Sequence, residues 1–115
     1  MANNNLALDA VFGALSDPTR RAIIQRLGRG PASVSELAEP FPMALPSFMK
    51  HVSVLEDCGL IRSSKVGRIR TCMLERKKLA AAERWFSKQR AMWANRYDNL
   101  DGLLAQLSGD DDHET

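Results

Sequence analysis

The sequence predicts a mainly α-helical (α+β) fold that includes one two-stranded β-hairpin. Three observations support this prediction. Apolar residues recur at helical spacing through most of the chain. One segment, LIRSSKVGRIRTCML (residues 60–74), alternates instead and has a glycine at its centre. With 115 residues, the chain is long enough for one modest core and short for two.

Two helices are predicted at the start of the chain. The first has a broad apolar face, made of Leu6, Leu8, Val11, Phe12 and Leu15. Asp17 then suits the N-cap of a second helix, and Pro18 suits its first position. This helix is expected to run to about Leu27, before a Gly-Arg-Gly-Pro break. Arg20 and Arg21 fall in its first turn, where the helix dipole disfavours cations, so at least one is expected to pair with a carboxylate.

Two short helices follow, joined by a tight connection. Ser33 and Glu36 fit a capping box, which predicts a third helix that ends before Pro40. A fourth helix is predicted to begin near Leu45 and to end at Gly59. Its apolar residues fall on one helical face, which is expected to be buried: Leu45, Phe48, Val52 and Leu55.

A hairpin and one long helix complete the chain. Val66-Gly67 marks the hairpin turn, and Lys65 and Arg68 bracket it. Nothing interrupts a helix from residue 76 to residue 107, and its apolar residues repeat every seven positions, as in helices that pack on a partner helix. The acidic segment SGDDDHET, residues 108–115, is predicted to be a disordered tail.

The net charge is only +2, but the cations are concentrated early in the chain. Residues 1–80 hold 12 Lys/Arg against 7 Asp/Glu, whereas residues 81–115 hold 4 against 7. This local excess of positive charge indicates a polyanionic partner. No apolar run approaches the roughly 20 residues that span a bilayer, and the N-terminus lacks the pattern of a signal peptide. We therefore expect a cytoplasmic protein without membrane contact.

Two short helices followed by a basic hairpin predict a winged helix-turn-helix domain over residues 1–107. The apolar face of the fourth helix packs on the body, so its polar face is free to enter the major groove of double-stranded DNA. The hairpin tip is the wing, whose cations contact the flanking DNA. His51 is expected to make a structural hydrogen bond or a phosphate contact. The predicted DNA-binding residues are Pro46, Ser47, Met49, Lys50, His51, Ser53, Lys65, Arg68 and Arg70.

The sequence also resembles a known family. The segments FGALSDPTRR (12–21), ELA (36–38) and KHVSVLEDCGLI (50–61) are similar to those of the ArsR/SmtB winged-helix repressors, and the likeness covers about residues 6–107. The resemblance implies a homodimer, built on the first and last helices, that represses its own operon and is released by an effector. The predicted dimer-interface residues are Leu8, Val11, Phe12, Phe86, Trp93, Tyr97, Leu100, Leu104 and Leu107.

The chain departs from the metal-sensing members of that family. It has no cysteine in residues 36–39 and no histidine in residues 73–107, so no metal or cofactor is expected and the effector stays unknown. Ala44 stands where a capping serine is usual in the family. Cys58 and Cys72 are expected to be reduced thiols that are buried or half-buried. A thiol- or metal-responsive site at these cysteines is the alternative.

Two other functional classes compete with a DNA-binding regulator. A protein–protein interaction module would pair its last helix with a different protein, and would be a monomer when isolated. An enzyme is disfavoured, because the sequence has no paired carboxylates, activated nucleophile or metal-ligand constellation.

Overall fold

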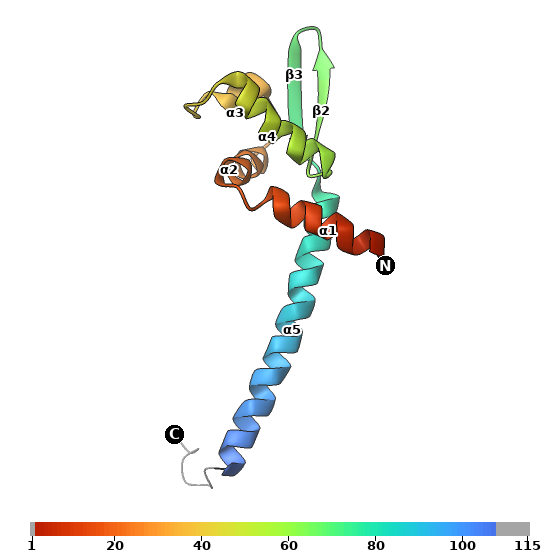
Figure 1. The fold of residues 1–115 in the computed structure, drawn as a ribbon, viewed down its shortest axis with the longest axis vertical. Helices are drawn as coiled ribbons and strands as arrows, with labels where there is room; N and C mark the ends of the chain where they lie inside the picture. Colours follow the sequence, from red (N-terminus) through yellow and green to blue (C-terminus); the bar gives the residue numbers. More distant parts are fainter. Residues whose placement is uncertain (1, 108–115) are drawn as a thin grey trace. The chain divides into compact units, whose positions relative to one another are not determined.

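The structure, a computed structural model, describes residues 2–107, with side chains from residue 7 onward (Figure 1). Its helices are α1 (Ala2–Ala14), α2 (Pro18–Leu27), α3 (Val34–Ala38), α4 (Leu45–Asp57) and α5 (Arg76–Leu107). Its strands are β1 (Ala32–Ser33), β2 (Ile61–Val66) and β3 (Ile69–Leu74). The predicted contacts of Leu6 and the predicted tail lie outside the described residues. The prediction of a mainly helical, winged helix-turn-helix fold is confirmed.

Helix boundaries lie where the local chemistry predicts them. Asp17 caps α2, because its Oδ2 accepts a hydrogen bond from the backbone N–H of Arg20 at 3.0 Å. Ser33 and Glu36 form the predicted capping box of α3, with bonds of 2.8 and 3.1 Å. Gly59 follows α4 with a φ of +82°, a conformation that would strain any residue with a side chain. These features mark the start of α2, the start of α3 and the end of α4, whereas the N-cap of α4, Ala44, makes no side-chain hydrogen bond.

The core lies within the first of two compact units, which ends at Ala82. Helices α1 to α4 and the sheet contribute fully buried side chains, among them Val11, Ile23, Phe48, Val52, Leu55, Leu60, Ile61 and Cys72. Val11 is 1% exposed, and this corrects its prediction as a dimer-interface residue. The apolar face of α1 is broad enough to serve two surfaces, and the side that carries Val11 packs on its own chain.

The buried face of α4 is shorter than the sequence predicts. Phe48, Val52 and Leu55 are buried, but Leu45 is 56% exposed. Leu45 is the first residue of the helix, one turn before Phe48, and lies beyond the edge of the core. The prediction that Leu45 is an inward-facing residue is therefore wrong.

The sheet has one strand more than the predicted hairpin. Strands β2 and β3 pair antiparallel from Ile61↔Leu74 to Val66↔Ile69, and Gly67 occupies the turn with a φ of +63°. Strand β1 adds to the other edge of β3, in the order β1-β3-β2. Because β1 has only two residues, it has no alternating pattern for a sequence analysis to detect. It directly precedes α3, and so it ties the helix-turn-helix to the hairpin.

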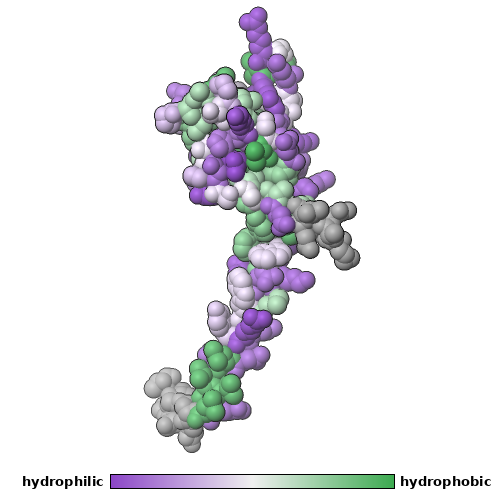
Figure 2. Space-filling view, in the orientation of Figure 1, coloured by the Kyte–Doolittle hydropathy of each residue, from purple (hydrophilic) through white to green (hydrophobic). Residues whose placement is uncertain are grey.

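The second unit begins at Glu83 and, as far as the structure describes it, is the remainder of α5. Large apolar side chains are exposed along it: Trp85, Phe86, Met92, Trp93, Tyr97, Leu100, Leu103, Leu104 and Leu107. Figure 2 shows hydrophobic surface gathered toward the C-terminal end of this helix. Exposed apolar side chains in such number on one element are typical of interaction surfaces. Of the helices in residues 2–107, none has both the length and the apolar character to cross a membrane.

Candidate nucleic-acid interface

The outer face of α4 presents most of the predicted base-contacting residues to solvent. Pro46, Lys50 and Ser53 recur at helical spacing on the side opposite the buried face, and all three are exposed. Ser47 is exposed as well, whereas Met49 is half-buried. This side of α4 therefore has the accessibility that a helix in the major groove needs.

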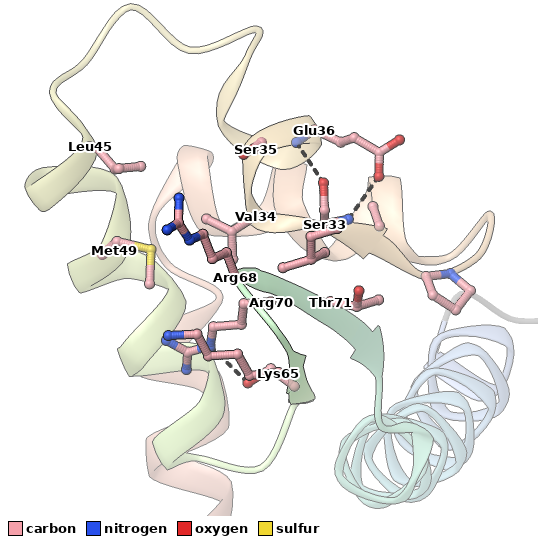
Figure 3. Close-up of a pocket in the computed structure, with 14 residues that line it drawn as sticks. Ser33, Val34, Ser35, Glu36, Leu45, Met49, Lys65, Arg68, Arg70 and Thr71 are labelled. Atoms are coloured by element: carbon pink, nitrogen blue, oxygen red, sulfur yellow. Dashed lines mark hydrogen bonds between the residues drawn. The ribbon is translucent and has the colours of Figure 1, made fainter.

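A hollow of about 1100 Å³ separates the start of α4 from the hairpin and from α3 (Figure 3). Leu45 and Met49 line it from α4, and in Figure 3 the guanidinium of Arg68 extends from the hairpin toward them. The hairpin also contributes Ser63, Lys65, Ile69, Arg70 and Thr71. The structure thus brings helix and wing residues that are about twenty positions apart in the sequence to one depression.

Three of the predicted cations keep their charge available. Lys50, Lys65 and Arg68 are exposed, and none of them forms an ion pair with another residue in the range 2–107. Figure 2 shows hydrophilic side chains that extend from the end of the hairpin. A cation without a carboxylate partner is free to neutralise a phosphate and release its counterion.

Arg70 has partners within its own chain. Its Nε donates a hydrogen bond to Ser63 Oγ at 3.0 Å, and its Nη2 pairs with Glu56 Oε1. The Ser63 hydroxyl in turn donates to the second oxygen of Glu56. This set of three side chains, the wing anchor, joins β2 and β3 to the last turn of α4. Arg70 stays a predicted DNA-binding residue, but its charge is already engaged.

His51 also lies against other side chains. Its Nδ1 is 3.1 Å from Arg20 Nη1 and 3.7 Å from Asp17 Oδ2. The pKa of Asp17 is lowered, first by the backbone hydrogen bond from Arg20 and further by attraction to His51 and Arg20. The Asp17 carboxylate is therefore held in its charged form. The observed contacts match the structural hydrogen bond expected for His51, and a phosphate contact stays a prediction.

The cations in the first turn of α2 have partners that the sequence did not indicate. Arg20 donates from Nε to the carbonyl of Ala14 at 2.7 Å and from Nη2 to that of Gly13 at 3.2 Å. Arg21 donates to the carbonyl of Leu15 at 2.8 Å. These carbonyls lie at and just beyond the end of α1, where the regular helical hydrogen bonds stop. The carbonyl of Gly13 also accepts hydrogen bonds from the N–H and the hydroxyl of Ser16. The expected side-chain pairing with a carboxylate is replaced by bonds to carbonyls at a helix C-terminus, where cations are favourable.

Both cysteines are free thiols. Cys72 is fully buried, as its position in β3 predicts, and burial raises the pKa of its thiol, with a further increase from Glu56. Cys58 is half-buried at the end of α4, where its thiol donates to the carbonyl of Leu55 at 3.4 Å. In the part of the chain that the structure describes, no three His, Cys, Asp or Glu side chains are grouped to hold a metal ion.

The fold and the exposed face of α4 define a helix-turn-helix protein, and comparison with known proteins agrees. A family model described as a helix-turn-helix domain matches residues 15–64. The chain is 40% identical over 73 residues to the HTH-type transcriptional regulator Rv2034 of Mycobacterium tuberculosis, covering 64% of this chain and 68% of that protein. It is 34% identical over 61 residues to the transcriptional repressor SdpR of Bacillus subtilis, covering 53% and 68%.

Solved structures agree with these relatives. The crystal structure of an ArsR family transcriptional regulator is 56% identical, with a TM-score of 0.76 over 78% of this chain and 93% of that one. A homodimeric winged helix-turn-helix DNA-binding domain from Mycobacterium bovis, 18% identical, has a TM-score of 0.62 over 85% and 88%, a likeness of fold alone. The present chain belongs to the ArsR family of winged helix-turn-helix transcriptional regulators. It is a DNA-binding regulator of transcription and not an enzyme.

Proposed function

We propose that this chain is a homodimeric, cytoplasmic repressor that binds a two-fold symmetric operator near its own gene. The observation that carries the proposal is the hollow between α4 and the hairpin, bordered by the exposed cations Lys65 and Arg68. In this proposal Lys50, Lys65 and Arg68 neutralise phosphates, while Pro46, Ser47, Met49 and Ser53 face base edges. That a relative, SdpR, is a transcriptional repressor supports repression as the outcome.

Pairing of two chains accounts for the apolar surface of α5. Trp93, Tyr97 and Leu100 are exposed within one stripe of the second unit, together with Phe86, Leu104 and Leu107. The half-buried Leu8 and Phe12 on α1 complete the proposed interface. A homodimeric protein of the same fold supports this assembly. Two copies would offer two recognition helices to half-sites about one helical turn, roughly 34–36 Å, apart.

Fluorescence anisotropy tests the proposal directly. A labelled duplex from upstream of the gene and an unrelated duplex would each be titrated at several salt concentrations. We expect tight, salt-sensitive binding with a clear preference for the upstream duplex. Replacing Lys65 and Arg68 together with alanine is expected to weaken binding to both duplexes. The slope of log affinity against log salt concentration should become shallower by about 0.9 for each phosphate that is no longer neutralised.

A matched control and a size measurement complete this test. Lys88→Ala removes an exposed cation from the second unit and is expected to leave the slope unchanged. Altered sequence preference with an intact slope in the Lys65/Arg68 variant would contradict the assigned roles. No binding even at low salt, from a chain that sediments as a monomer, would instead favour the protein–protein interaction module.

A further inference from the structure

The side of α4 that faces the wing is apolar where the helix begins. Leu45 is 56% exposed, Met49 follows it one turn later, and both project into the hollow (Figure 3). Ile69 on β3, 61% exposed, lines the same hollow from the wing. Single exposed apolar residues are ordinary on protein surfaces. Two exposed residues, Leu45 and Ile69, converge with the half-buried Met49 on one depression, and this set, which we name the apolar edge, suits a partner with apolar surface.

The chemistry of DNA restricts what that partner can be. Lys65 and Arg68 border the same hollow and suit phosphates. Among base edges in the major groove, the apolar group is the C5-methyl of thymine. Deoxyribose also offers carbon atoms, but every nucleotide has one, so contact with sugar would give no sequence preference. Contact with thymine methyl groups should therefore produce a sequence preference that can be measured, whereas contact with deoxyribose should not.

We propose that Leu45 and Met49 contact thymine methyl groups, and that these contacts specify thymine at defined positions of each half-site. This inference rests on the proposed function. Leu45 is the first residue of α4, and the N-terminal residues of a recognition helix lie nearest the base edges. Contact with a methyl group removes apolar surface of both partners from water, a gain that cytosine or a polar base edge does not offer. Ile69 lines the hollow from the wing side.

Replacing thymine with deoxyuridine in the DNA tests the contribution of the methyl group alone. A preferred duplex would be obtained from the upstream DNA or by selection from a random library, and its thymines replaced singly by deoxyuridine. This change keeps base pairing and the O4 acceptor and removes only the methyl. We expect the unaltered protein to lose affinity by about 4-fold at one or more positions per half-site, the effect of exposing one methyl-sized group.

Variants of the protein assign the effect to the apolar edge. Leu45→Ala and Met49→Ala are each expected to bind the thymine duplex more weakly by a similar factor. In one or both variants, deoxyuridine at the positions where it weakens binding of the unaltered protein should cause no further loss of affinity. Val54→Ala is the matched control, because Val54 is an exposed apolar residue of the same helix that lies outside the hollow. It is expected to retain the full deoxyuridine effect. Thermal unfolding confirms that each variant is folded.

The outcomes separate this inference from the proposed function. A protein that prefers its duplex but binds the deoxyuridine forms equally well overturns the thymine contact and leaves the operator-binding proposal standing. A deoxyuridine effect that persists in both alanine variants also overturns it. Absence of any preference between duplexes, in contrast, refutes sequence-specific binding itself.

Discussion

At the scale of single residues, Arg20 has an unusual number of roles. Its guanidinium donates to the carbonyls of Gly13 and Ala14 at the end of α1. The same group reaches Nδ1 of His51 on α4, while its backbone N–H is bound by Asp17. One side chain of α2 thus connects the helix before it to the recognition helix.

Replacing Arg20 with alanine is expected to lower the free energy of unfolding by about 2–3 kcal/mol, because two carbonyls and a histidine are deprived of a charged donor. Denaturation in urea measures the change. Arg21→Ala is the matched control, since Arg21 is exposed and makes one such bond, to Leu15. We expect it to lower the free energy of unfolding by about 1 kcal/mol or less. Equal effects of the two substitutions would contradict the role given to Arg20.

Cys72 is expected to resist alkylation in the folded protein. Burial raises the pKa of its thiol, so the reactive thiolate is scarcer at pH 8 than for an ordinary cysteine, and the sulfur is inaccessible. Iodoacetamide labelling followed by mass spectrometry should modify the half-buried Cys58 first, and Cys72 only after denaturant is added. Rapid labelling of Cys72 in the native protein would revive the thiol-responsive alternative.

At the scale of elements, the wing anchor decides how the hairpin is oriented. Arg70, Ser63 and Glu56 join both strands to the last turn of α4, at the opposite end of that helix from Leu45. The hairpin tip, where Val66 is 78% exposed, extends beyond these contacts. We therefore expect Arg70 to act on DNA binding by positioning the wing on the recognition helix.

Salt dependence distinguishes positioning from direct contact. Arg70→Gln is expected to weaken DNA binding while the slope of log affinity against log salt stays the same, because no phosphate contact is removed. Arg68→Gln, close by in the wing, should lower the slope by about 0.9. Glu56→Gln, which breaks the anchor from the other side, should resemble Arg70→Gln. A reduced slope for Arg70→Gln would instead establish the phosphate contact that the sequence predicts.

The same elements show which features a sequence can reveal. The cap at Asp17, the capping box at Ser33 and the turn at Gly67 depend on neighbours within a few residues, so their patterns predicted them. The pairing of Arg70 with Glu56 joins residues 14 positions apart, and no local pattern encodes it. Helical spacing places Leu45 on the buried face, but the spacing defines only a face and not where the core beneath it ends.

The same limit applies to α1, where helical spacing could not tell which apolar residues serve the core. Val11 is buried by its own chain, whereas Leu8 and Phe12 are only half-buried. The packing of the other elements decides between the two uses of this face, and the sequence of α1 alone does not contain that information.

At the scale of the whole molecule, the stripe on α5 is expected to control assembly. Leu100→Asp places a charge among apolar side chains and should weaken pairing by about 30-fold or more, if Leu100 lies at the centre of the interface. Analytical ultracentrifugation would show the shift from dimer to monomer. DNA affinity should fall with it, because the two half-sites are then no longer bound by one linked unit.

Asn95→Asp supplies the control for this change. Asn95 is exposed on the same helix, two residues after Trp93, on the side away from the apolar stripe. The Asn95→Asp substitution adds the same charge outside the proposed interface, so the dimer should persist. Equal effects of the two substitutions would indicate that charge on α5, and not the removal of an apolar side chain, disrupts assembly.

Every residue proposed to contact DNA precedes Ala82, whereas most of the proposed pairing surface follows it. This separation has a genetic consequence. A chain that lacks the Lys65 and Arg68 charges but keeps its stripe would still combine with wild-type partners. With equal expression and random pairing, only about a quarter of the dimers would carry two intact DNA-binding surfaces. Such an allele should therefore be dominant over the wild type, whereas an allele that also carries Leu100→Asp should be recessive.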